Sequence, residues 1–306
     1  MRRSMLTLLF LLFAIPAFAT DGVLEINQTC AVQTGCFVGD TAGFPVTISG
    51  GGSYRLTSDL VLPNNDVIGI DLQGIPKIVT IDLNGFEIRL CNDPGNLFCT
   101  PGGSGIGIRA IDPPGSDVNV VTVINGAVRN LGAGIILSKD AHVDRVRAHG
   151  NRGDGIVVGD RSIVSNSQSV LNQGHGIVTN GESRITGNIA SNNSGSGIVC
   201  GTIDTIIVFS DCVVEDNTAN KNTSSGIVSG GTIRGNVASE NNIGILANGV
   251  VTNNRARFNT SLGLSGSCAY NSNYFEANNG GNASPQVGVG ATEIGLNRCG
   301  TNTTCP

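Results

Sequence analysis

The chain of 306 residues has no tryptophan, and aromatic residues make up only 4% of it. A sequence this poor in large rings cannot build an ordinary globular core around them, although aliphatic side chains can still fill a narrow interior. Charged residues are also scarce at 13%, and the formal net charge is −5. Proteins that bind nucleic acid usually carry a basic stripe, so this charge balance argues against nucleic acid as a partner.

The N-terminus has the three parts of a secretory signal. Arg2 and Arg3 supply positive charge, residues 6–15 form an apolar stretch, and residues 17–19 read Ala-Phe-Ala, as at a cleavage site. The apolar stretch is too short to span a bilayer comfortably, and no later stretch qualifies. We therefore expect an exported protein, secreted, periplasmic or at the cell surface, with no membrane span after signal cleavage.

Nine cysteines all follow the signal, which fits an oxidising compartment. No Cys-x-x-Cys or Cys/His group has zinc spacing, so we interpret the cysteines as cross-links. Their spacing suggests four local pairs, namely Cys30–Cys36, Cys91–Cys99, Cys200–Cys212 and Cys299–Cys305. Cys268 is left over, and it could replace a partner in the C-terminal pair.

One phrase recurs from residue 130 onward. An Asn is followed four residues later by Gly and an aliphatic pair, as in Asn151-Arg-Gly-Asp-Gly155-Ile-Val. The Asn series is Asn130, Asn151, Asn172, Asn193, Asn222, Asn241 and Asn259. The Gly series is Gly134, Gly155, Gly176, Gly197, Gly226, Gly244 and Gly263. A period of about twenty residues, with short apolar runs between Gly and Asn turns, indicates a solenoid.

Each repeat has the length of one coil with three short strands, at about 3.3 Å per residue. The middle strand recurs at Val143, Ile163, Ile185, Val214, Ile233 and Val251. Equivalent residues of successive coils then stack about 4.8 Å apart. Inward Asn side chains at a bend would form a ladder that satisfies buried turn amides, and the glycines would permit a tight corner.

Segments outside the regular repeat predict loops and end caps. Residues 91–104 are rich in Pro and Gly, and the longer repeat contains an insertion at 200–212. A stack of coils needs caps because its end strands have open hydrogen-bonding edges. The expected organisation is a signal peptide at 1–19, an N-terminal cap at 20–45, a parallel β-helix at 46–267 and a C-terminal cap or tail at 268–306.

The Gly-Ile-x-Val phrases with their Asn ladder resemble the right-handed parallel β-helix repeats of the pectin-lyase-like superfamily, over about residues 46–280. The resemblance implies an all-β fold, a right-handed single-stranded parallel β-helix with disulfide-stapled caps and loops. That superfamily includes polysaccharide lyases, glycoside hydrolases, epimerases, esterases, adhesins and proteins of unknown role. A fold does not by itself select among these functions.

All three histidines fall between residues 140 and 184, together with many of the charged residues. Asp154 and His175 each precede a repeat Gly, so adjacent coils could bring them together as a catalytic acid and base. Their phrases resemble parts of the polygalacturonase motifs Asn-Thr-Asp-Gly and Gly-His-Gly. The two further aspartates and the Arg-x-Lys of that family are missing here, and polar residues at a Gly-rich corner are the alternative interpretation.

Further candidates come from the same region. Arg152 or Arg184 could serve as the base of a lyase, and the candidate substrate-binding residues are Arg145, Arg147 and His149. Counting three residues back from each middle-strand aliphatic gives four acids on consecutive coils, Asp140, Asp160, Glu182 and Asp211. Such a column could bind Ca²⁺, it could be neutralised by neighbouring arginines, or it could reflect only the preference of turns for Asp.

The sequence therefore predicts an exported β-helix protein that binds, and in one version modifies, an acidic extracellular polysaccharide. As an enzyme it would resemble a polysaccharide lyase or glycoside hydrolase. The alternative is a non-catalytic structural or surface-interaction protein. The scarcity of aromatic rings counts against sugar stacking, and the repeats, which are mostly explained as scaffold, favour that alternative.

Overall fold

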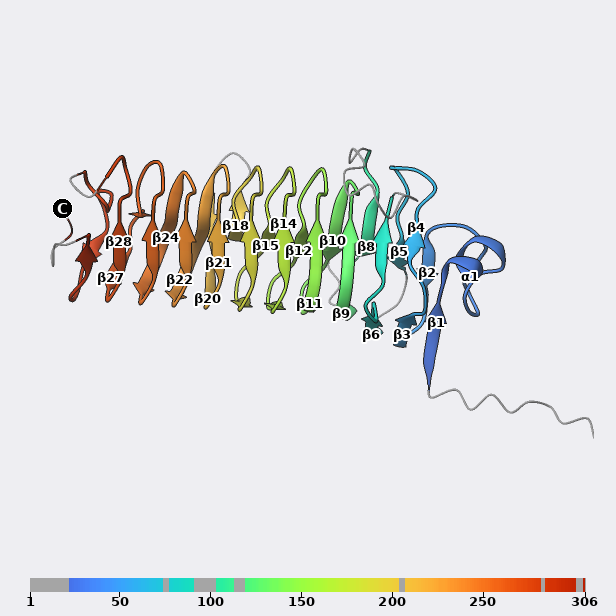
Figure 1. Cartoon of the computed structure of the whole chain (residues 1–306). Coiled ribbons are helices and arrows are strands. Elements are labelled where there is room, and N and C mark those ends of the chain that lie inside the picture. Colours follow the sequence, from blue (N-terminus) through green and yellow to red (C-terminus); the bar gives the residue numbers. More distant parts are fainter. Residues whose placement is uncertain are drawn as a thin grey trace, which may run out of the picture.

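The computed structural model describes residues 22–73, 77–90, 103–112, 119–203, 207–281, 284–300 and 305. The predicted signal peptide, the Cys91–Cys99 pair and most of the predicted loop at 91–104 lie outside these residues. The chain winds into one elongated stack of coils, with β1 (Val23–Ile26) near one end and β28 (Tyr274–Glu276) near the other (Figure 1). The predicted all-β, right-handed parallel β-helix is confirmed.

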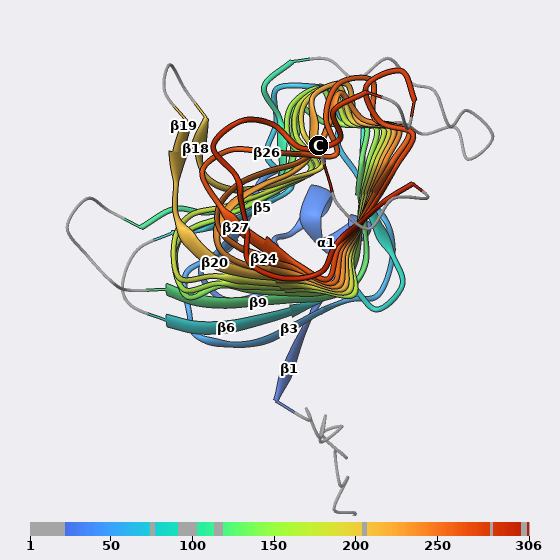
Figure 2. The ribbon, with the colours of Figure 1, turned by 90° about the vertical axis from the view of Figure 1, so that its left-hand side faces the viewer.

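Three parallel sheets run along the stack, and Figure 2 shows their strands superposed along the axis. The first sheet contains β2 (Val46–Ile48), β5 (Ile70–Leu72), β8 (Ile106–Ala110), β10 (Ala133–Leu137), β12 (Ile156–Val158), β15 (Ile177–Thr179), β18 (Ile198–Ile203), the first halves of β22 (Ser225–Arg234) and β24 (Ile243–Thr252), and β26 (Leu264–Ser265).

The second sheet begins with β1 and continues with β3 (Gly52–Leu56), β6 (Lys77–Asp82), the first parts of β9 (Asn119–Arg129) and β11 (His142–His149), β13 (Ile163–Ser165), β16 (Arg184–Thr186), β20 (Asp211–Glu215), the second halves of β22 and β24, β27 (Ala269–Asn271) and β29 (Thr292–Glu293).

The third sheet contains β4 (Leu60–Val61), β7 (Glu87–Arg89), the last parts of β9 and β11, β14 (Gln168–Val170), β17 (Ile189–Ser191), β21 (Thr218–Asn220), β23 (Val237–Ser239), β25 (Arg255–Arg257), β28 and β30 (Arg298–Cys299). Parallel pairing thus continues past residue 267, because β27 pairs with β29 and β28 with β30.

Stacked aliphatic side chains form the core. One column of the first sheet is fully buried over seven coils, Ile135, Ile156, Ile177, Ile198, Ile227, Ile245 and Leu264. Burying one such side chain stabilises the fold by about 1.5–3 kcal/mol. A narrow interior filled in this way explains how the chain folds with few large rings, of which Tyr54 and Phe275 are buried in the core.

The register of the middle strand differs from the prediction at one coil. Val143 pairs with Val164 and Val164 with Ile185, so Val164 is the inward residue. Val164 is 0% exposed, whereas Ile163 is 41% exposed. Because side chains alternate between the faces of a strand, a shift of one residue moves every neighbour to the opposite face.

The predicted Asn ladder lies at the corner between the third and first sheets. Asn172 Nδ2 donates to Asn193 Oδ1 (3.0 Å), while Asn172 Oδ1 accepts from the backbone N–H and the Nδ2 of Asn151 (3.0 and 2.9 Å). The same bonds continue to Gln286, through Asn222, Asn241, Asn259 and Asn278. Asn130 is not a member, because Leu131 N–H donates to Asn151 Oδ1 and Leu131 therefore occupies the ladder position.

A second ladder, which the sequence analysis missed, lies at the corner between the second and third sheets. Asn188 Nδ2 donates to Asn217 Oδ1 (3.0 Å) and to the Val164 carbonyl (2.8 Å). The ladder continues through Asn217, Asn236, Asn254, Asn273 and Asn297. Except at the terminal Asn297, the residue before each ladder Asn has a left-handed backbone, as Leu171 (φ 59°) and Gly187 (φ 67°) show. Both corners thus repeat one local conformation along the stack.

The repeat glycines are required for close packing between coils. A Cβ at Gly176 would lie 2.5 Å from the Gly197 carbonyl oxygen and 2.8 Å from Asn193 Nδ2. No side chain fits in that space, and any larger residue would displace the ladder itself. This close approach is the physical reason for the Gly series.

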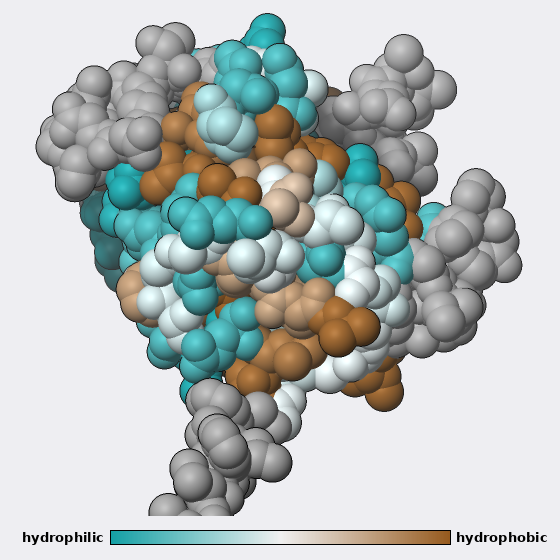
Figure 3. All heavy atoms as spheres, turned by 90° about the vertical axis from the view of Figure 1, so that its right-hand side faces the viewer, coloured by the Kyte–Doolittle hydropathy of each residue, from teal (hydrophilic) through white to brown (hydrophobic). Residues whose placement is uncertain are grey.

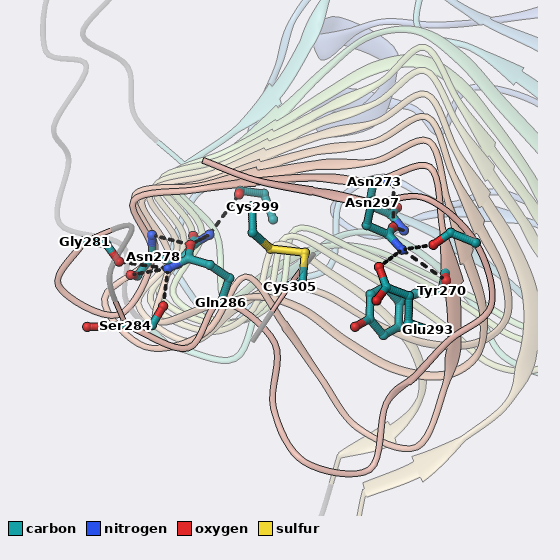
Figure 4. Close-up of a disulfide and its surroundings, with 12 residues drawn as sticks. Tyr270, Asn273, Asn278, Gly281, Ser284, Gln286, Glu293, Asn297, Cys299 and Cys305 are labelled. Carbon is teal, nitrogen blue, oxygen red and sulfur yellow. Dashed lines mark hydrogen bonds between the residues drawn. A yellow bond between two sulfur atoms is a disulfide. The ribbon is translucent and has the colours of Figure 1, made fainter. Parts of the chain in front are cut away.

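Caps close both ends of the stack. Helix α1 (Gln28–Gln33) begins after Asn27, whose side chain accepts from Cys30 N–H, and it contributes the buried Ala31 to the core. Figure 3 looks onto this end and shows apolar patches among polar residues. At the other end, Gln286 terminates one ladder by donating to three backbone carbonyls, and Asn297 terminates the other (Figure 4).

Disulfide bonds join Cys30 to Cys36, Cys200 to Cys212, and Cys299 to Cys305, as predicted. Cys268 is buried and unpaired. The predicted insertion at 200–212 is an antiparallel pair of β18 with β19 (Ile207–Phe209), with the second disulfide at its base. Within the described ranges, we find no helix that combines the length and the apolar character of a membrane span.

Candidate functional site

Asp154 and His175 lie on adjacent coils, as predicted, but they bind backbone groups. Asp154 Oδ1 accepts from the backbone N–H of His175 (2.6 Å). His175 Nδ1 in turn accepts from the backbone N–H of Ser196 (2.9 Å). The two side chains therefore act as consecutive caps for the corner between the third and first sheets, and the imidazole does not share a proton with the carboxylate.

The two candidate bases have different surroundings. Arg152 is exposed on the same corner. Arg184 forms an ion pair with Glu215, whose side chain is only 3% exposed, and Arg234 pairs with the same carboxylate from the other side. The hydrogen bond that Arg234 donates to Glu215 raises the pKa of Arg234. Arg184 is thus committed to neutralising a buried carboxylate.

The four acids do not form one column. The backbone N–H of Asp140 donates to the Asp160 carbonyl (2.9 Å), which places Asp140 beside Arg161 on the next coil. Arg161 binds Asp140 through two hydrogen bonds (2.9 and 2.6 Å). These bonds are the main reason why the pKa of Asp140 is lowered. Asp160 Oδ1 accepts from Gly181 N–H (3.0 Å).

The predicted acidic register is therefore wrong, because it was counted from the exposed Ile163 and not from the buried Val164. Over the described ranges, no group of three or more His, Cys, Asp or Glu side chains is arranged to hold a metal ion. Glu182 and Asp211 lie on later coils of the same corner, and both are exposed.

Of the candidate substrate-binding residues, Arg145 belongs to a network on the second sheet. Its guanidinium contacts Asp144 Oδ2 (2.6 Å) and donates to Asn125 Oδ1 (2.8 Å). Burial raises the pKa of Asp144, but hydrogen bonds from Asn166 and Ser165 and the charge of Arg145 outweigh it, and the pKa is lowered overall. Arg145 therefore stabilises a buried carboxylate.

Arg147 and His149 lie together on the outer surface of the third sheet. They alternate along β11 with Ala148, which is 0% exposed and packs inward. His149 pairs with Arg129 of the previous coil, and Arg129 pairs with Arg89 of the coil before that. We call Arg89, Arg129, Arg147 and His149 the N-terminal basic cluster.

The N-terminal basic cluster is only partly neutralised. Arg129 Nε donates to Glu87 Oε2 (2.6 Å), and Arg89 Nη2 donates to Asp59 Oδ2 (3.4 Å). Arg89 and Arg129 are buried, with 7% and 8% of their surface exposed, and their buried Nη1 groups have no hydrogen-bond acceptor among the described residues. Arg147 is exposed and forms no ion pair with a described residue. The exposed Arg147 guanidinium is thus the arginine of this cluster that an anion can reach.

The charge of the cluster also affects its histidine. Partial burial lowers the pKa of His149, and the nearby positive charges of Arg147 and Arg129 lower it further. The charge of Glu87 opposes this shift and does not reverse it. A bound anion would favour the imidazolium form, because an opposite charge stabilises the charged state.

The sequence analysis missed Arg89 and Arg129 because they precede the regular repeat. A signal for them was present in the alternation Glu-Ile-Arg at 87–89, Ala-Val-Arg at 127–129 and Arg-Ala-His at 147–149. Each triplet places an apolar residue inward between two outward positions. The stacking of the three triplets became evident only from the pairing of β7, β9 and β11.

The outward strand positions of the third sheet hold six arginines, of which Arg89 and Arg129 are buried, and two glutamates. These are Arg89, Arg129, Arg147, Arg255, Arg257 and Arg298, with Glu87 and Glu276. By contrast, the arginines of the second sheet, Arg55, Arg184 and Arg234, all form ion pairs with acids of that sheet. In the central coils the first sheet presents aliphatic residues, Ile136, Val157 and Val178.

Comparison with known proteins agrees with the fold. No family model and no curated protein sequence matches the chain. Among solved structures, the A-module of mannuronan C-5 epimerase AlgE4 from Azotobacter vinelandii is similar, with 14% identity and a TM-score of 0.58, over 93% of this chain and 89% of that one. The periplasmic alginate epimerase AlgG is similar with 16% identity and a TM-score of 0.55, over 91% of this chain and 72% of that one.

At these identities the similarity establishes the fold alone, a parallel β-helix. The activity of those proteins is not transferred to this chain by the comparison.

Proposed function

We propose that this protein is an exported β-helix protein that binds a linear acidic polysaccharide on the outer surface of its third sheet. The observation that carries the proposal is the concentration of arginines at the outward positions of this sheet, six against two glutamates, in a chain whose net charge is −5. Arg89 and Arg129 are buried, whereas Arg147, Arg255 and Arg298 are exposed. A guanidinium presents a planar fork of donors that matches the geometry of a carboxylate. A uronic acid polymer carries such a carboxylate on every sugar.

The shape of the surface supports an extended ligand. Successive coils repeat equivalent positions about every 4.8 Å in a straight column, and the arginines of the third sheet lie in such columns. A polymer lying parallel to the axis would meet the same two columns over many coils. The similar structures support the proposal as well, since they are named as epimerases of mannuronan and of alginate.

Export is part of the proposal and has two supports. The N-terminal sequence has the pattern of a secretory signal. Three disulfide bonds fit an oxidising compartment such as the periplasm or the cell exterior.

The proposal concerns binding and leaves catalysis aside. Asp154 and His175 cap backbone amides, and Arg184 neutralises a buried glutamate. These interactions give the three residues a structural role. Arg147 and His149 remain as ligand-binding candidates, and the buried Arg129 lies level with His149 on the previous coil.

Binding can be tested by calorimetry with polymannuronate or polygalacturonate at low and high salt. We expect binding that weakens as salt increases, because exposed charges are screened. Arg147→Gln should weaken it about tenfold, since a hydrogen bond to a charged group is worth about 1.5 kcal/mol or more. Arg161→Gln is the matched control, because it removes one exposed arginine from the corner between the first and second sheets.

Two results would overturn the proposal. One is the absence of binding to any acidic polysaccharide at low salt, which would favour a structural protein. The other is an equal loss of affinity in both variants, which would mean that only the overall charge of the protein matters. Dextran, a neutral polymer, should not bind at low or at high salt.

A further inference from the structure

We infer that the C-terminal end of the third sheet is a second polyuronate subsite, so that one ligand chain bridges two basic clusters. The inference rests on the proposed function, since it names a further site for the same class of ligand. The second subsite consists of Arg255, Arg257 and Arg298, with the rings of Tyr274 and Phe258. We call these three arginines the C-terminal basic cluster.

The stacking of the coils assembles this cluster. Arg255 pairs with Tyr274, and Tyr274 pairs with Arg298, so the three side chains form one outward column on consecutive coils. Arg257 lies two residues after Arg255 on β25 and therefore on the same face. Residues separated by more than forty positions in the sequence are thus placed side by side.

Aromatic rings orient two of the arginines. The Arg255 guanidinium carbon lies 5.4 Å from the centre of the Tyr274 ring, and the Arg257 carbon lies 5.4 Å from that of Phe258. Such stacking is worth about 0.5–1 kcal/mol at exposed sites. It leaves the in-plane N–H donors of the guanidinium available, so less conformational entropy is lost when a carboxylate binds.

The cluster keeps an excess of positive charge. Glu276 is its only acid on the strand positions of this face, and Arg255 Nη2 lies 3.5 Å from Glu276 Oε2. Neither Arg257 nor Arg298 forms an ion pair with a described residue, and Arg298 is exposed. In a chain so poor in aromatic residues, two rings beside three arginines on one face also distinguish this region.

A neutral stretch separates the two basic clusters. The column that starts at Arg147 reaches Arg255 after five coil-to-coil steps, through Gln168, Ile189, Thr218 and Val237. At about 4.8 Å a step, the two clusters are about 24 Å apart. The neighbouring outward column is also uncharged there, with Val170, Ser191, Asn220 and Ser239.

This spacing predicts a dependence on ligand length. An oligomer shorter than the gap can occupy only one cluster at a time, and two oligomers bind to each protein. A chain long enough to reach both clusters binds once, and its second contact benefits from a high effective concentration. We expect affinity per chain to rise at least tenfold at the bridging length, together with a change in stoichiometry from two ligands to one.

Calorimetry with size-fractionated oligouronates tests the inference, with oligomers well below the gap of about 24 Å and others more than twice that length. Arg298→Gln should reduce long-chain affinity at least tenfold and reduce the short-oligomer stoichiometry toward one. Thr218→Glu, which adds a carboxylate to the neutral stretch, should weaken only the long chains. Arg161→Gln serves again as the charge-matched control, and near-ultraviolet circular dichroism of each variant verifies folding.

The outcomes separate the two proposals. If Arg147→Gln weakens binding of all lengths while Arg298→Gln has no effect, and short oligomers bind once, the second subsite is refuted and the first stands. If no oligouronate of any length binds, the proposed function itself fails. A stoichiometry of two for short oligomers that persists in Arg298→Gln would also overturn the bridging arrangement.

Discussion

Asn172 shows how single residues hold the coils of this protein together. Its side chain bonds to Asn151 below and Asn193 above, and its Nδ2 also donates to Ser169 Oγ (3.0 Å). It is 1% exposed, so water cannot replace these partners. Each ladder member thus satisfies polar groups of two other coils, and its loss is felt beyond its own position.

We expect Asn172→Ala to lower the free energy of unfolding by at least about 2 kcal/mol, because several buried polar groups lose a partner at about 1–3 kcal/mol each. Asn166→Ala should cost less, since Asn166 is exposed and makes one side-chain bond, to Asp144 (2.9 Å). Chemical denaturation of both variants measures the difference.

A matched control lies directly beside the ladder. Asn192 is exposed, and its side chain makes no hydrogen bond with a described residue. Its φ is 57°, and Asn192→Gly keeps this left-handed backbone accessible. It should leave stability almost unchanged. Equal destabilisation by Asn172→Ala and Asn192→Gly would contradict the role we assign to the ladder.

The lowered pKa of His149 predicts how the stability of the protein depends on pH. Its pKa in the folded protein is lowered by burial and by Arg147 and Arg129, whereas in the unfolded chain it should be near 6.5. Below that pH the unfolded state takes up a proton that the folded state resists. The stability that the neutral His149 side chain contributes is therefore complete above about pH 6.5, and it is lost as the pH falls through the lowered pKa of His149 in the folded protein.

The measurement is the free energy of unfolding between pH 7.5 and pH 5 for the wild type and His149→Gln. We expect the wild type to lose more stability than the variant over this window, since the other titrating groups are common to both. A wild type that gains stability relative to the variant on acidification would show that the pKa is raised.

At the scale of strands and corners, register decides which charges meet. Val164 faces the core, so Arg161 and not Asp160 occupies the position beside Asp140. Opposite charges are thereby placed on adjacent coils and form two hydrogen bonds. A column of acids would have needed a cation, whereas this arrangement is neutralised by the protein's own side chains.

Calcium should accordingly have no effect on stability. The Arg161 guanidinium donates a hydrogen bond to Asp140, and the backbone N–H of Gly181 donates one to Asp160 Oδ1. Neither carboxylate is therefore free to help form a calcium site. Melting curves with Ca²⁺ and with a chelator should superimpose. A melting temperature that rises with Ca²⁺ in the wild type and fails to rise in Asp160→Asn would instead establish a calcium site that uses this acid.

At the scale of the whole molecule, charge is segregated among the sheets. The second sheet pairs its arginines with its own acids, and the first sheet is aliphatic in its central coils. The third sheet keeps unpaired arginines at both ends of a neutral stretch. An elongated solenoid makes such a surface straight and periodic, which suits a long linear ligand better than a compact one.

The sequence by itself determined the solenoid, its period and the inward Asn and Gly positions from 151 onward, because each coil repeats the same local constraints. It also indicated three of the disulfides, whose partners are close along the chain. These features depend on short-range spacing, and a one-dimensional pattern records spacing directly.

Only the tertiary structure decided the second ladder, the pairing of Arg161 with Asp140 and the grouping of Arg147 and His149 with Arg89 and Arg129. These depend on which residues of different coils lie level with one another. Coils vary in length from 18 to 29 residues, and a single added residue reverses the face of every side chain that follows it within a strand. Contacts between coils are therefore fixed by the hydrogen-bonded register, which the spacing of the repeats does not reveal.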